Sequence, residues 1–261
     1  MSTLGWIISF TLLGGFFSAS LAGLFLLLDE RTRSRSMPYL VAFATGALLG
    51  AALLGLLPEA IALSAPDHFE TVGLSLLGGI ALFFILEKLV LWRHCHEDHC
   101  ETHVPSHDHL DKASASLLLV GDGVHNMLDG VLIAAAFLTD VKLGIVAGFA
   151  VMAHEIPSEV GNFAVLLQGG MSRARALVFN LGTSLTSVAG GLIGYFALSK
   201  ALGALPYALG VSAASLLYVA VADLIPGLHR RVDPRSSIKQ VLLMTVGVLV
   251  IFAVEKLLPH G

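Results

Sequence analysis

Long apolar stretches, separated by short polar breaks, recur along the whole chain and constrain its fold more than any other feature. A helix needs about 20 apolar residues to cross a bilayer, and inside lipid the backbone groups must bond within helices. The sequence therefore predicts an all-α integral membrane protein. Its eight transmembrane helices are expected at Leu4–Leu28, Pro38–Leu63, Val72–Trp92, Ala113–Leu138, Gly144–Leu167, Ala174–Leu198, Leu205–Leu228 and Ile238–Leu258.

Composition agrees with a membrane protein. The 261 residues are 56% hydrophobic and 13% charged, whereas a soluble domain is about half apolar and a quarter charged. The first stretch has no basic start and no clear cleavage site, so we expect a membrane helix there rather than a signal peptide. We expect one transporter domain over residues 1–261, with the lipid bilayer as partner and no nucleic acid; a homodimer is compatible with the sequence.

Basic residues predict the orientation. Of the 15 lysines and arginines, all except Lys142, Lys200 and Lys256 lie in or beside the loops after the first, third, fifth and seventh helices. Cytoplasmic loops are rich in these residues, so both termini are predicted on the outer side. The short loops and the lack of a eukaryotic targeting signal favour a bacterial inner (plasma) membrane, with the termini in the periplasm.

The first three and the last three helices share residues at a constant offset of 168. An odd number of helices separates equivalent members, so the two copies run in opposite directions. Inverted repeats are typical of transporters, with the substrate site near mid-membrane. The sequence thus predicts a 3+2+3 arrangement with the fourth and fifth helices between the copies. The matches include Glu87 with Glu255, Pro58 with Pro226 and Gly79 with Gly247.

The fourth and fifth helices carry polar residues that do not belong in lipid. The spacing i, i+3, i+4, i+7 places residues on one helix face. On the fourth helix, one face holds Asp122, His125, Asn126 and Asp129. On the fifth helix, one face holds Glu155, Ser158, Glu159 and Asn162, and His154 lies at the edge of that face.

These charges indicate a metal site. A charged group at the bilayer centre costs about 2.5 kcal/mol or more, so the carboxylates need compensation. Two facing carboxylates and two imidazoles can neutralise and coordinate one divalent cation. Imidazole with carboxylate suits zinc, iron and nickel, whereas an all-oxygen shell suits magnesium or calcium. The sequence therefore predicts a site formed by His125, Asp129, His154 and Glu155.

The loop between the third and fourth helices, residues 93–112, is rich in metal-binding side chains. Its composition predicts a flexible cytoplasmic loop that collects metal; the alternative is a solvated linker. Two thiols in a cytoplasmic loop are expected to be reduced. The loop holds both cysteines, Cys95 and Cys100, and six of the 11 histidines, which are His94, His96, His99, His103, His107 and His109.

Further residues are candidates for the ion path. Glu59 and Asp223 occupy nearly equivalent repeat positions close to helix ends. They either line the path or are ordinary carboxylates at the membrane interface. Asp122 and Ser158, on the two polar stripes, are path candidates as well.

The two polar helices resemble those of the ZIP family of metal transporters. The runs His125-Asn126-x-x-Asp129-Gly130 and His154-Glu155-Ile156-Pro157-x-Glu159 are similar to the family's paired signatures. The second run resembles the subgroup with a His-Glu-Ile-Pro motif on helix five. The segment Tyr218–Pro226 is similar to the family's seventh helix, and the resemblance covers essentially the whole chain.

The resemblance implies import of Zn²⁺ into the cytoplasm, with Fe²⁺, Mn²⁺ and Cd²⁺ as further ions. It also implies a primary site, an adjoining site and one carboxylate nearby. The primary site would consist of His125, Asp129 and His154, and the adjoining site of Asn126 and Glu155. The nearby carboxylate is that of Glu159. The chain departs from the family at Ser158, where many relatives carry histidine or glutamate, and at Asn162, where the subgroup often has aspartate.

Two other functions compete with metal transport. Histidines and a carboxylate in membrane helices could hold the zinc of an intramembrane zinc-dependent hydrolase. The zincin form is excluded because Ser158 stands where the second histidine is needed, and the inverted repeat favours transport over enzymatic activity. A proton-coupled transporter of organic substrates would not require two polar stripes.

Overall fold

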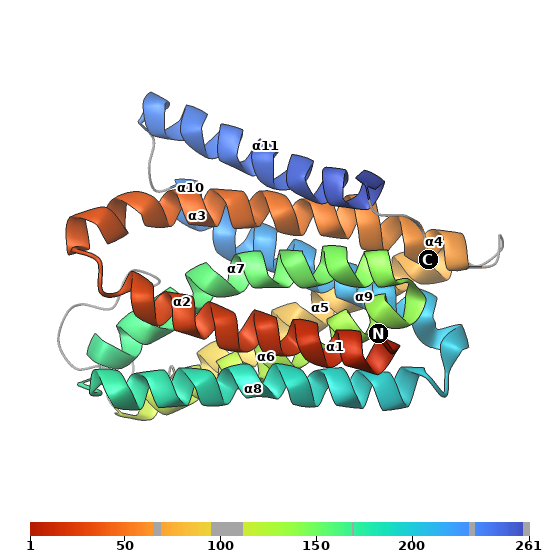
Figure 1. Ribbon diagram of the computed structural model, residues 1–261, viewed down its shortest axis with the longest axis horizontal. Coiled ribbons are helices and arrows are strands. Elements are labelled where there is room, and N and C mark those ends of the chain that lie inside the picture. Colours follow the sequence, from red (N-terminus) through yellow and green to blue (C-terminus); the bar gives the residue numbers. More distant parts are fainter. Residues whose placement is uncertain (65–68, 95–111, 169, 230–232, 258–261) are drawn as a thin grey trace.

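The computed structural model describes residues 1–64, 69–94, 112–168, 170–229 and 233–257, and within them it is a bundle of long helical segments (Figure 1). In chain order these are α1 (Thr3–Leu12), η1 (Leu13–Phe17) and α2 (Ser18–Phe25); α3 (Glu30–Gly50), η2 (Ala51–Leu56) and α4 (Leu57–Leu63); α5 (Phe69–His94); α6 (Lys112–Thr139); α7 (Val141–Gln168); α8 (Arg173–Leu198); η4 (Leu202–Ala204), α9 (Leu205–Tyr218), η5 (Val219–Leu224) and α10 (Ile225–His229); and α11 (Pro234–Leu257).

Seven of the described segments are long and apolar enough to cross a membrane. The remaining long helix, α6, has 28 residues and contains the polar stripe that begins at Asp122. The structure is therefore the all-helical membrane bundle that the sequence predicts. In Figure 1, α1 begins and α11 ends at the same end of the bundle, as an even number of crossings requires.

The second segment begins earlier than predicted, at Glu30 rather than Pro38. Asp29 caps α3, because its carboxylate accepts a hydrogen bond from the Thr32 amide at 3.0 Å and another from the Thr32 hydroxyl at 2.7 Å. Such a cap pairs an amide that the start of a helix otherwise leaves without a partner. The polar residues 31–36 are consequently helical, and Pro38 lies inside α3.

Widened π-helical turns recur at the offset found in the sequence. η2 (Ala51–Leu56) and η5 (Val219–Leu224) lie 168 residues apart, and each is followed by a proline, Pro58 or Pro226. Proline lacks an N–H, and its ring crowds the carbonyl four residues earlier. A π-helical turn accommodates both effects within a continuous helix. The third such turn, η1, has no counterpart, since the equivalent residues 181–185 lie within α8.

Helix packing also repeats at the offset of 168. α3 packs along α11, and α5 packs along α9. Because α3 corresponds to α9 and α5 to α11 in the repeat, the two packed pairs are equivalent. Gly247 of α11 lies against Phe43 of α3, and Gly79 of α5 lies against Val211 of α9. Gly79 and Gly247, like Phe43 and Val211, are 168 residues apart. The sequence repeat is thus also a repeat of packing contacts.

α6 and α7 place the two histidines at the middle of their own lengths. His125 is the fourteenth of 28 residues in α6, and His154 is the fourteenth of 28 in α7. Toward the end of the bundle where the termini lie, the two helices join an apolar core with α1, α3 and α9. Trp6 and Phe10 of α1 pack against Phe137 of α6 in this half. Apolar side chains therefore fill the bundle on one side of the two histidines.

Candidate metal centre

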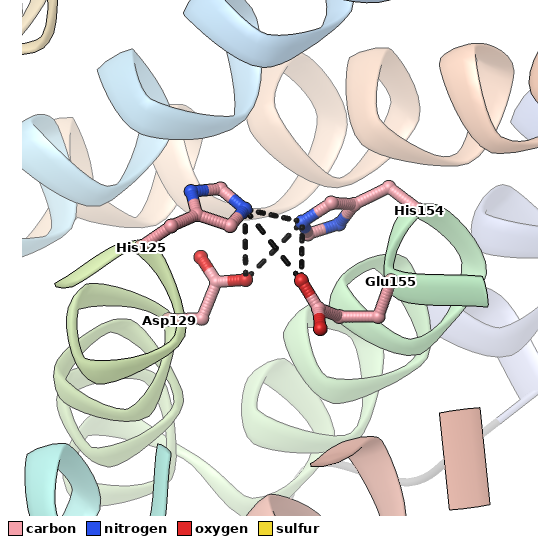
Figure 2. A group of neighbouring side chains, drawn as sticks. All are labelled: His125, Asp129, His154 and Glu155. Atoms are coloured by element: carbon pink, nitrogen blue, oxygen red, sulfur yellow. Dashed lines mark hydrogen bonds and ion pairs between the residues drawn. The ribbon is translucent and has the colours of Figure 1, made fainter. Parts of the chain in front are cut away.

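Four side chains from α6 and α7 converge at the middle of the bundle, and we call them the quartet: His125, Asp129, His154 and Glu155 (Figure 2). His154 Nε2 lies 3.2 Å from Asp129 Oδ2 and 3.5 Å from Glu155 Oε1. His125 Nε2 lies 3.8 Å from Asp129 Oδ2 and 3.6 Å from Glu155 Oε1. The two Nε2 atoms are 3.2 Å apart. The structure thus brings together the four residues that the sequence grouped.

Helix geometry explains why these residues meet. His125 and Asp129 are four residues apart on α6, so their side chains lie one above the other on the same face. His154 and Glu155 are neighbours on α7, and about 100° of helix rotation separates them. The side chains of His154 and Glu155 can therefore lie on either side of the α6 face that carries His125 and Asp129. Figure 2 shows the two pairs pointing toward one another from the two helices.

A backbone contact fixes the His154 ring. His154 Nδ1 lies 3.2 Å from the Ala150 carbonyl oxygen, one turn earlier on α7. Because a carbonyl can only accept, Nδ1 carries the proton and Nε2 presents its lone pair to the quartet. Hydrogen bonds of this kind orient metal-binding histidines and set their tautomer.

Three of the four quartet side chains are buried, and the two carboxylates lack hydrogen bonds. Asp129 and Glu155 are each 1% exposed, and His154 is 2% exposed. Within the described part of the chain, none of the four carboxylate oxygens has a hydrogen-bond partner. Buried charges persist when they are paired or coordinate a metal. Two imidazole nitrogens beside two such carboxylates form a donor set that a divalent transition metal accepts.

Asn126 and Glu159 lie beside the quartet but bond elsewhere. The Asn126 amide donates to the Asp122 carbonyl of its own helix at 3.1 Å. The Glu159 carboxylate accepts a hydrogen bond from the Ser184 hydroxyl of α8 at 2.8 Å. Among the His, Cys, Asp and Glu residues that the structure describes, the quartet is the group of three or more whose ligand atoms all lie within 4.8 Å of one another. The roles predicted for them, Asn126 in an adjoining site and Glu159 as a nearby carboxylate, stay predictions.

The path candidates are spread along the bundle. Asp122 accepts a hydrogen bond from the Asn162 amide at 2.7 Å, so the two stripes also meet one turn from the quartet. Asp223 in η5 is exposed. Ser158 of α7 and Glu59 of α4 are partly buried.

The His/Cys-rich loop falls almost entirely outside the described residues. His94 is the last residue of α5. His96, His99, His103, His107 and His109, with both cysteines, lie beyond the described part. A metal-collecting role for this loop therefore stays a prediction.

Sequence reasoning missed two polar residues of α8, Asn180 and Ser184. Both are buried. The Asn180 amide donates to the Glu159 carbonyl at 3.3 Å, and Ser184 bonds to the Glu159 carboxylate. Their i, i+4 spacing in an apolar helix is the signal that could have found them.

The profile of the ZIP zinc transporter family matches residues 3–255, nearly the whole chain. The chain belongs to the ZIP zinc transporter family. It is 33% identical to zinc transporter ZIP13 of Pongo abelii over 231 residues, which are 81% of this chain and 64% of that protein. It is 31% identical to ZIP13 of Homo sapiens over 258 residues, covering 81% and 68% of the two chains. It is 32% identical to ZIP4 of Mus musculus over 276 residues, covering 82% and 41%.

Membership of the ZIP family decides between the competing functions. Its members are zinc transporters, so this chain is an integral membrane protein that transports zinc and is not an enzyme. The hydrolase alternative has no support. The ZIP13 and ZIP4 relatives come from vertebrates. The bacterial inner membrane, the outward termini and the homodimer therefore stay predictions.

Proposed function

We propose that the quartet holds Zn²⁺ in transit and that the ion is released into the cytoplasm. The proposal rests on the carboxylates of Asp129 and Glu155, which are buried and have no hydrogen-bond partners. They face two imidazoles at the middle of α6 and α7. One divalent cation at that point would neutralise both carboxylates and use the Nε2 atoms of both histidines.

The spacing of the donor atoms supports a four-coordinate ion. Zinc binds nitrogen and oxygen ligands at about 2.1 Å in a tetrahedron, which separates the ligand atoms by about 3.4 Å. The pairs that involve a histidine nitrogen are 3.2 to 3.8 Å apart. Zinc is therefore the first candidate. Fe²⁺, Mn²⁺ and Cd²⁺ are further ions for which this mixed donor set is suitable.

The distribution of polar groups supports release toward the basic loops. On one side of the quartet the bundle is filled by the apolar core. On the other side, α6 and α7 carry Asp122, Glu159 and Asn162, and η5 carries Asp223. Loops rich in lysine and arginine lie on the cytoplasmic side of membrane proteins, and here they follow α2, α5, α7 and α10. An ion that leaves the quartet thus meets polar side chains in the cytoplasmic direction.

Uptake by proteoliposomes tests the proposal. Wild-type protein should accumulate zinc, whereas Asp129→Asn and His154→Ala should lower the initial rate about tenfold or more, because each removes a ligand. Glu70→Gln is the matched control, since Glu70 is an exposed carboxylate in the first turn of α5. Normal uptake by both quartet variants would exclude the quartet as the transport site. The same assay with Fe²⁺, Mn²⁺ and Cd²⁺ ranks the ions.

A further inference from the structure

A groove of about 390 Å³ lies between α2, α3 and α7 and shares no residue with the quartet. It lies where three membrane-spanning segments end or begin, at Phe25, Glu30 and Leu167. In Figure 1 the end of α2, the start of α3 and the end of α7 lie at the end of the bundle opposite the two termini. Ligand sites have volumes of about 300–1,000 Å³, so the groove is large enough to hold part of a lipid or another small molecule.

One half of the groove is apolar and reaches into the depth of the membrane. Val160, Ala164 and Leu167 line it from α7, and their i, i+4, i+7 spacing makes them one stripe. The stripe extends about 10 Å along the helix axis from the end of the segment. Met37 of α3 and Phe25 of α2 line the same groove and are only partly buried. In a bilayer, the molecules that cover such apolar surface are the acyl chains of lipids.

The other half of the groove carries an arginine without a partner. Arg33 of α3 lines the groove, and its Nε is buried with no hydrogen-bond acceptor in the described part of the chain. Glu30 lines the groove as well, but among the described residues no ion pair joins it to Arg33. Two further basic residues, Arg31 and Arg35, are exposed beside Arg33 on α3 and outweigh the single charge of Glu30. A buried charged donor without an acceptor is costly, so this half favours an anion.

We propose that the groove holds one anionic phospholipid of the bilayer, with its phosphate on Arg33 and one acyl chain along the apolar half. The guanidinium group matches the geometry of a phosphate, and basic pockets between transmembrane helices bind anionic headgroups. A soluble anion would use only the charged half of the groove, whereas a phospholipid uses both halves. The lipid links α3 to α2 and to α7, the helix that carries His154 and Glu155.

Lipid titration of the purified full-length protein in a neutral detergent tests the lipid site. Native mass spectrometry counts the bound lipids and compares anionic phosphatidylglycerol with zwitterionic phosphatidylcholine of the same acyl chains. Wild type should bind one phosphatidylglycerol about tenfold more tightly than phosphatidylcholine, because only the former carries a net negative charge. Arg33→Gln should lose this preference. The matched control Arg35→Gln removes the same charge from an exposed position two residues away and should keep the preference.

A second variant tests the apolar half of the groove without changing any charge. Ala164→Leu fills the space along α7, so both lipids should bind about tenfold more weakly; its thermal unfolding in lipid-free detergent shows whether it is folded. Phosphatidylglycerol should raise the unfolding midpoint of wild type, whereas inorganic phosphate should not.

Three results would overturn the lipid site. An equal loss of preference in Arg33→Gln and Arg35→Gln would mean general attraction between charges. Equal stabilisation by inorganic phosphate would mean a site for a free anion. A changed oligomeric state in Arg33→Gln, with lipid binding unchanged, would mean that a second copy of the chain occupies the groove.

Discussion

Ser158 lies one turn after His154 on α7 and is partly buried, so a longer side chain there can reach the quartet. A hydroxyl is a weak zinc ligand compared with imidazole. We expect Ser158→His to tighten zinc binding about tenfold and to lower turnover at saturating zinc, because a transported ion must also leave. Zinc titration and uptake rates measure the two effects, with Ser158→Ala as control. If affinity and rate both stay unchanged in Ser158→His, position 158 does not face the ion.

Zinc binding should also depend on pH through the imidazoles of the quartet. A histidine binds metal only when deprotonated, and protons therefore compete for the Nε2 atoms of His125 and His154. Affinity should therefore be higher at neutral pH than in acid. Zinc titrations at about pH 7.5 and pH 5.5 measure the change, for which we expect about tenfold. A flat affinity would contradict the assignment of both histidines as ligands.

The quartet was predictable because a buried charge is costly and because i, i+4 spacing fixes a helix face. His125 and Asp129 follow that rule, and His154 and Glu155 stand opposite them. The partner of Glu159 was not predictable in the same way. The i, i+4 spacing of Asn180 and Ser184 marks one polar face of α8, but it does not say which residue of a neighbouring helix that face meets. The bond from Ser184 to Glu159 therefore emerged only from the structure.

At the scale of helices, the sequence predicted positions better than internal shape. The eight apolar stretches match the eight long segments, and the offset of 168 reappears in η2 and η5. The widened turns themselves were not predicted, because a proline in a helix can be accommodated by a kink or by a π-helical turn. The cap on α3 was missed since Asp29 lies outside the apolar pattern.

Adjacent glycines on α5 give a matched test of helix packing. Gly79 is buried, and a Cβ there would lie 2.6 Å from the Ala214 Cβ of α9, whereas a Cβ on Gly78 would have nothing within 4 Å. Gly79→Leu should therefore separate α5 from α9 and destabilise the fold by about 1–3 kcal/mol or more. Gly78→Leu should leave stability near wild type. Thermal unfolding in detergent compares the two, and equal midpoints would contradict the close contact.

For the whole molecule, the loops give an orientation that can be tested with the protein's own thiols. Cys95 and Cys100 lie in a loop predicted to be cytoplasmic, so a membrane-impermeant maleimide should not label them in intact cells. Ser199→Cys, exposed after α8 on the opposite side, should be labelled. Permeabilised cells with a chelator present are the control and should show all thiols labelled. Labelling of the wild type in intact cells would reverse the predicted orientation.

The four members of the quartet differ in their access to water, and this difference has a kinetic consequence. The His125 side chain is 25% exposed, whereas Asp129, His154 and Glu155 are exposed by at most 2%. Solvent can therefore replace the imidazole of His125 before it reaches any other ligand. We expect His125 to govern how fast the coordination shell opens, while the two enclosed carboxylates govern how strongly the resting ion is held. Dissociation rate and equilibrium affinity would then be set by different residues, which lets one site bind tightly and still exchange its ion quickly.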